Sequence, residues 1–171
     1  MSFDTDKAWS DRFIPSIKSI VGPLMLEPSS LEVDTKQAAD LVVLTGRNLT
    51  IACRIRRHKY AVRYPRQFTI RSERKSGAFT ELKKFVDGWG DWMFYGFESA
   101  PDSTEVLPWY VIDLNAFRAA MVRNDKVRSA AMAAKDNVDL SSSFVSFSLD
   151  LFTTPPQILI ASSDTTMVKA A

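Results

Sequence analysis

Apolar residues recur every three or four positions in the first segment of the chain, which predicts an amphipathic helix over residues 5–21. The apolar face is made by Trp9, Phe13, Ile17, Ile20 and Val21. Pro15 interrupts the pattern, so we expect a kink or two short helices near it. Gly22-Pro23 should end the helical segment, and residues 24–38 show no clear pattern.

Two short apolar runs follow, over Leu41–Leu44 and Leu49–Ile55, with Thr45-Gly46-Arg47-Asn48 between them. This arrangement is typical of a β-hairpin, and we expect residues 40–55 to form one. Alternation along the second strand places Leu49, Ile51, Cys53 and Ile55 on a core face, and Ala52, Arg54 and Arg56 on the opposite face.

Further patterns predict a strand over 68–71, after a break at Pro65, and a helix over 80–89. The helix has an apolar stripe of Leu82, Phe85, Val86 and Trp89. Strands are then expected over 92–97 and 109–113, a helix over 115–135 capped by Asp113 or Asn115, and strands over 144–149 and 158–161.

The element order predicts a single α/β domain built on a mixed sheet. We expect a core over about residues 5–98, an α/β extension over about 105–162 and a frayed tail over 163–171.

Composition agrees with a globular domain, because 46% of the 171 residues are apolar and 25% are charged. No apolar run is long enough to cross a bilayer, and the first residues do not resemble a secretory signal. Cys53 is the only cysteine, which excludes an internal disulfide and a cysteine-cluster zinc site. We therefore expect a cytoplasmic protein with no membrane partner.

Charge is concentrated in residues 54–75, which hold nine bases and one acid, whereas the remainder holds thirteen bases and nineteen acids. A basic segment on an otherwise acidic chain favours an anionic partner, and we expect DNA or RNA. The candidate nucleic-acid-binding residues are Arg54, Arg56, Arg57, Lys59, Arg63, Arg66 and Arg71. A solvated face with internal salt bridges is the alternative.

Tyr60, Tyr64 and Phe68 alternate with these bases and could stack on nucleobases, or else pack in the core, as we expect for Phe68. Trp89, Trp92, Phe94, Tyr95 and Phe97 form an aromatic cluster that we expect in the core. Part of this cluster could instead form an exposed patch for a protein partner or a homodimer.

Motifs for other chemistry are weak. His58, the only histidine, is expected at the surface, so a serine or cysteine triad has little support. The glycines do not form a phosphate-binding motif.

The acid at Asp40, the expected hairpin and the charged second strand resemble the core of the PD-(D/E)xK nuclease superfamily. The resemblance implies an αβββαβ nuclease-like core, as in members from prophages and mobile elements. Asp40 matches the family's first acid, but Ala52 stands at the second metal-binding carboxylate and Arg54 at the lysine. Asp40 and Arg54 are therefore candidates for a vestigial catalytic site, and we expect no cofactor.

Three hypotheses follow from these patterns. The leading one is a nucleic-acid-binding protein with a nuclease-like fold that does not cut. The second is a nuclease dependent on Mg²⁺ or Mn²⁺, with Asp11, Glu32 or Asp34 as relocated metal ligands beside Asp40. The third is a phage-type protein-interaction or anti-defence module. The choice between DNA and RNA, the sequence specificity, the oligomeric state and the biological role stay open at this stage.

Overall fold

Buried side chains form two clusters, one on each face of a four-stranded sheet. The computed structural model describes residues 3–28, 41–43, 49–77, 80–137, 142–155 and 157–164. The strands of this sheet are β3 (Ile51–Arg56), β5 (Trp92–Glu98), β6 (Val106–Asp113) and β9 (Leu159–Ser162), in the order β3-β5-β6-β9. β3 and β5 are parallel and the other pairs are antiparallel, so the sheet is mixed, as predicted.

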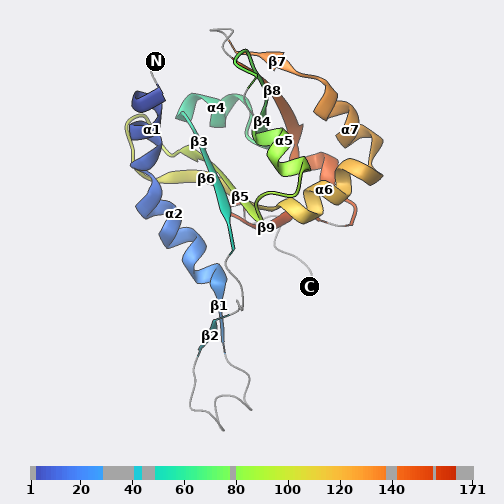
Figure 1. Cartoon of the computed structure of the whole chain (residues 1–171). Coiled ribbons are helices and arrows are strands. Elements are labelled where there is room, and N and C mark those ends of the chain that lie inside the picture. Colours follow the sequence, from blue (N-terminus) through green and yellow to red (C-terminus); the bar gives the residue numbers. More distant parts are fainter. Residues whose placement is uncertain are drawn as a thin grey trace.

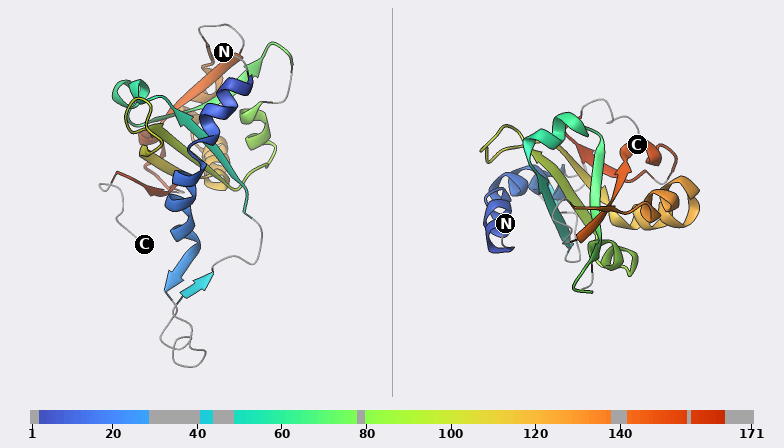
Figure 2. Two further views of the ribbon diagram at one scale, coloured as in Figure 1. Left: turned by 90° about the vertical axis from the view of Figure 1, so that its left-hand side faces the viewer. Right: turned by 90° about the horizontal axis from the view of Figure 1, so that it is seen from above.

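Two helices cover the first face of this sheet (Figures 1 and 2). They are α1 (Phe3–Asp11) and α2 (Ile14–Val21), and a 3-10 helix, η1 (Gly22–Met25), follows. The prediction of two short helices near Pro15 is thus confirmed. The proline lies in the first turn of α2, where its backbone nitrogen has no helical hydrogen bond to lose. Phe13, Ile17 and Val21 pack against the sheet, as their spacing predicted.

A second, three-stranded antiparallel sheet covers the other face, in the order β4-β8-β7. Its strands are β4 (Gln67–Arg74), β8 (Ser142–Ser148) and β7 (Lys135–Asp136). The rings of Phe68 and Phe147 stack between the sheets with their centres 5.2 Å apart. Tyr95 and Phe117 pack edge to face on the Phe68 ring. Phe68 is fully buried, which confirms its prediction as a core residue.

The predicted hairpin over residues 40–55 is wrong. β2 (Leu41–Val43) pairs with β1 (Leu26–Pro28) in a separate two-stranded ladder, and β3 pairs with β5. A turn signal reports only local geometry, whereas β3 gains a long, buried and distant partner strand. The three strands expected to be consecutive in one sheet therefore belong to three sheets.

Four further helices lie in the described ranges: α4 (His58–Arg63), α5 (Glu81–Val86), α6 (Leu114–Arg123) and α7 (Asp125–Met132), with the 3-10 helix η2 (Leu149–Phe152). The sequence patterns predicted no helix at α4. The helix expected over 115–135 is split at Asn124, whose side chain caps α7, and Asp113 caps α6. Its last expected residue, Lys135, belongs to β7.

The apolar stripe expected over 80–89 is only half correct. Leu82 and Phe85 pack on the core, but α5 ends at Val86, and Gly88 and Gly90 adopt positive φ angles that turn the chain. Trp89 therefore lies beyond the helix and is 71% exposed, while Phe94, Tyr95 and Phe97 are in the core as predicted.

No helix in the described ranges is long and apolar enough to span a membrane.

Candidate nucleic-acid interface

Arg54 and Arg56, predicted to share one face of β3 with Ala52, contact α5 and β4. Arg56 donates a hydrogen bond to Thr69 Oγ1 of β4 at 3.0 Å, and this oxygen lies 3.3 Å from the Tyr95 hydroxyl. Ala52, on the same face, packs on the inter-sheet core. Ile51 and Ile55 point to α1 and α2, but Cys53 is exposed, so its prediction as a core residue is wrong.

A groove of about 280 Å³ opens where α4 crosses the junction of the two larger sheets. Residues of β3, α4, β4, β5, β7 and β8 line it, and Figure 1 shows how these elements are arranged. Its lining combines aromatic, cationic and uncharged polar side chains, chiefly Tyr60, Tyr64, Tyr95, Phe97, Phe144, Arg56, Arg63, Lys135, Gln67, Thr69 and Ser146. One carboxylate, Asp136, also lines it.

Cations and tyrosine rings alternate along α4. The Arg56 guanidinium lies 4.4 Å from the centre of the Tyr60 ring, and Arg63 lies 5.3 Å from that of Tyr64. Tyr60 packs partly on the core, whereas Tyr64 is 39% exposed. Tyr64 thus offers an accessible aromatic surface beside a positive charge, which is the combination that binds stacked bases in single-stranded nucleic acids.

Three cations of the groove, Arg56, Arg63 and Lys135, have no ion pair with any carboxylate in the described ranges. Arg56 is held instead by Thr69 and the Tyr60 ring. Lys59, also predicted, is exposed on α4 with its Nζ 5.3 Å from the Tyr60 ring. These charges can therefore bind phosphate without first breaking a salt bridge.

A basic strip continues from the groove along β3 and β4. Arg54 forms an ion pair with Glu81 of α5 at 2.5 Å, and Glu81 also accepts from the Arg71 backbone N–H at 3.1 Å. Burial lowers the pKa of the Arg71 guanidinium, nearby Arg54 and Arg74 lower it further, and Glu81 opposes both effects. Glu81 and Asp6 thus offset part of the charge of Arg54, Arg71 and Arg74, and Glu73 lies between the last two on β4.

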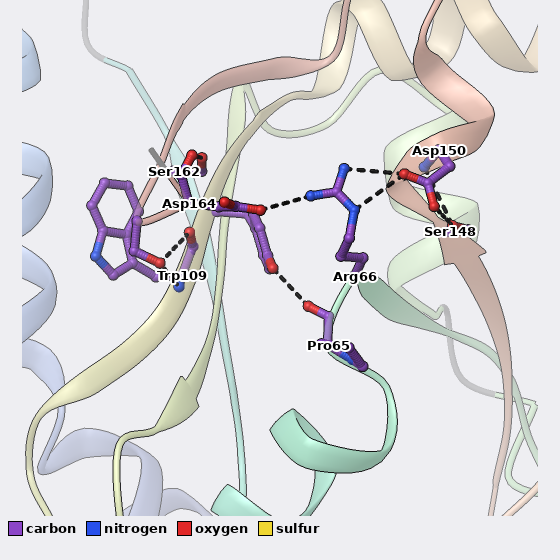
Figure 3. A network of polar contacts seen from close by, with 9 residues as sticks. Pro65, Arg66, Trp109, Ser148, Asp150, Ser162 and Asp164 are labelled. Carbon is purple, nitrogen blue, oxygen red and sulfur yellow. Dashed lines mark hydrogen bonds and ion pairs between the residues drawn. The ribbon is translucent and has the colours of Figure 1, made fainter. Parts of the chain in front are cut away.

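Arg66, another predicted nucleic-acid-binding residue, is held by acids from the C-terminal part of the chain (Figure 3). Its guanidinium contacts Asp150 at 3.0 Å and Asp164 at 2.8 Å. Burial opposes its charge, but the hydrogen bond and charge of Asp150, with Asp164, raise the pKa of Arg66 overall. For Arg66, the contacts therefore agree with the alternative given above, an internal salt bridge, rather than with a free phosphate-binding group.

Arg57 and His58, at the start of α4, contact α1 and β5. The Arg57 guanidinium lies 4.2 Å from the Trp9 ring, and the His58 ring lies 3.3 Å from the Glu98 carbonyl oxygen. His58 is half-buried rather than on the surface as expected.

Asp40, Glu32 and Asp34 lie outside the described residues, so their predicted roles stay predictions. Asp11 forms an ion pair with Lys7 on α1. Within the described ranges, no three His, Cys, Asp or Glu side chains gather as a metal site would require. The carboxylate that does reach the charged face of β3 is Glu81, which sequence reasoning missed because it lies on a different element, far along the chain.

Comparison with protein-family models, with curated proteins and with solved structures gives no match to this chain.

Proposed function

We propose that this protein binds nucleic acid through the groove beside α4 and the basic strip between β3 and β4. The observation that carries the proposal is the combination of accessible aromatic rings with cations that lack a carboxylate partner in the described structure. Phosphate contacts supply sequence-independent affinity, and aromatic rings supply stacking.

Fluorescence anisotropy with labelled DNA and RNA of about 20 nucleotides tests this proposal across about 50 to 200 mM salt. We expect micromolar or weaker affinity that falls steeply with salt, because bound phosphates release counterions. The triple variant Lys59→Ala, Arg63→Ala, Lys135→Ala should weaken binding and lower the salt slope by about 2 to 3. No binding by the wild type at low salt would overturn the proposal.

A matched control removes the same charge from outside the groove: Lys18→Ala, Arg123→Ala, Lys126→Ala. All three residues are exposed, on α2, α6 and α7. Because nonspecific attraction depends on net charge, both triple variants would weaken binding equally if no interface existed. The proposal requires a clearly larger loss in the groove variant.

A second candidate function, a nuclease with relocated ligands, is favoured by one contact, namely Glu81 beside Arg54 on the face that also carries Ala52. Glu81 could supply a metal-binding oxygen, but the Arg54 charge opposes a divalent cation there. We therefore expect cleavage with Mg²⁺ or Mn²⁺ to be absent or very slow. Robust cleavage by the wild type that is abolished by Glu81→Gln would favour the nuclease instead.

A further inference from the structure

We infer that the groove takes one unpaired nucleobase, so that the protein binds single strands in preference to duplexes. This inference rests on the proposed function and specifies its ligand. The groove, at about 280 Å³, is near the lower limit of small-molecule pockets, which suits a single base rather than a stacked pair.

Flat aromatic side chains from three elements line the groove. Tyr60 and Tyr64 come from the α4 region, Phe97 from β5 and Phe144 from β8. An arginine lies beside each tyrosine ring, Arg56 at Tyr60 and Arg63 at Tyr64. Tyr60 packs partly on the core, however, whereas Tyr64 is 39% exposed. Tyr64 is therefore the ring on which an entering base would stack.

Uncharged polar side chains of the groove suit the edge of a base. Gln67 and Ser146 line it, and neither side chain has a hydrogen-bond partner among the described residues. A glutamine amide and a serine hydroxyl each offer a donor and an acceptor. These groups can bond to a Watson–Crick edge, which is free only when the base is unpaired.

Cations at the groove would bind the backbone phosphates of the strand whose base enters it. Arg56, Arg63 and Lys135 line the groove, and Arg54 of β3 with Arg71 and Arg74 of β4 continues the strip from it. A single strand can put a base between the rings while its backbone follows these charges. A duplex keeps its bases stacked and paired, so it can contact only the charges.

The experiment compares three probes of equal length on the full chain: a single strand, a single strand of the same charge with abasic sites throughout, and the duplex, which carries about twice the phosphates. We expect the wild type to bind the single strand roughly 5- to 100-fold more tightly than the abasic strand, as base stacking contributes in other single-strand sites. It should also bind the single strand more tightly than the duplex at the same salt.

Tyr64→Ala should remove most of the preference for the strand with bases, and Tyr64→Phe should retain it, because the ring is kept. Val62→Ala is the matched control, since Val62 lies two residues before Tyr64 in the last turn of α4, is 76% exposed and does not line the groove. Circular dichroism verifies that all three variants are folded.

Equal affinity for the strands with and without bases would overturn the inference, as would tighter duplex binding or an unchanged preference in Tyr64→Ala. In each of these cases salt-dependent binding would persist, so the proposed function would survive. Failure to bind any probe at low salt would overturn both.

Discussion

Arginines of the same sequence segment have different roles, which are set by the acids that reach them. Arg66 contacts two carboxylates, from Asp150 and Asp164, whereas Arg63 has no ion pair in the described part of the chain. A guanidinium already satisfied by two carboxylates gains little from a phosphate, because the existing pairs must first be broken. Counting bases in the sequence cannot separate the two cases, since the acids lie far along the chain.

Arg66→Ala and Arg63→Ala remove the same charge but should have different effects. We expect Arg66→Ala to lower the free energy of unfolding by about 1 kcal/mol, a modest value because the pairs are partly exposed. Arg63→Ala should leave stability unchanged within about 0.5 kcal/mol and weaken nucleic-acid binding more than Arg66→Ala. Urea unfolding and anisotropy measure the two effects, and the reverse ranking would contradict this assignment.

Tyr110 gives the domain a dependence on alkaline pH. Its hydroxyl donates to the Pro65 carbonyl oxygen at 2.6 Å, and burial raises the pKa of Tyr110, with Asp164 and Asp150 adding to the effect and Arg66 opposing it. Because the folded pKa exceeds the unfolded value of about 10, the stabilising contribution is complete below about pH 10. It is lost as the pH rises through the folded pKa.

We therefore expect the stability difference between the wild type and Tyr110→Phe to shrink as the pH rises above about 10. At neutral pH the variant should be less stable by about 1 kcal/mol, the usual value of one hydrogen bond. Urea titrations of both proteins from neutral pH to about pH 11 measure the difference. Other titrating groups are common to both proteins and cancel. A difference that is constant with pH would exclude this role for Tyr110.

At the scale of elements, local patterns predicted the buried strands β5 and β6, the helix break near Pro15 and the Asp113 cap. Periodicity and capping depend on neighbouring residues, so the sequence reveals them. The parallel pairing of β3 with β5 carries no local signal. α4 was also missed, because its position depends partly on a hydrogen bond from the His58 N–H to the distant Glu98.

For the site, the sequence identified the basic segment and its tyrosines correctly as neighbours, but it could not assign partners. Arg54 meets Glu81, Arg57 meets Trp9, and each contact joins separate elements. Which cations stay unpaired depends on tertiary packing. The groove itself was not predictable, because β7 and β8 contribute to it from the other end of the chain.

Gly96 shows how closely β5 packs in the sheet. A Cβ atom at this position would lie 2.3 Å from Val106 Cγ1 and 3.2 Å from the Phe94 ring. Gly96→Ala should therefore destabilise the protein by about 1 to 3 kcal/mol through overpacking. Val106→Ala should relieve part of the clash, so the double variant should lose less than the sum of the two single losses.

Gly22→Ala is the control for this substitution, because a Cβ atom at this position would have no heavy-atom neighbour within 4 Å and the φ angle of Gly22 is −51°. It should be neutral or slightly stabilising, since alanine restricts the unfolded chain. Thermal unfolding of the four variants measures these effects. Strictly additive losses at Gly96 and Val106 would rule out the steric explanation.

At the scale of the whole molecule, one buried carboxylate connects the helical layer to the helix that borders the groove. Glu98 ends β5 and is 2% exposed. Its Oε1 accepts from Arg12 Nη2 at 2.6 Å and from the Asp102 N–H at 2.9 Å, and its Oε2 accepts from the His58 N–H at 3.3 Å. Arg12 follows α1 and His58 begins α4, so both elements depend on the same side chain.

Glu98→Gln should weaken both connections together. The substituted amide has one accepting oxygen in place of two and no negative charge, so either Arg12 or the His58 N–H loses its partner. We expect a loss of roughly 2 to 3 kcal/mol in urea unfolding, because hydrogen bonds to charged groups contribute more than neutral ones. Glu105→Gln, an exposed change in the next loop, is the control and should stay within about 0.5 kcal/mol. Hydrogen exchange provides the decisive measurement. If both helices depend on Glu98, backbone amides of both α1 and α4 should exchange faster in Glu98→Gln than in the wild type. Faster exchange in only one of the helices would show that the two are held independently.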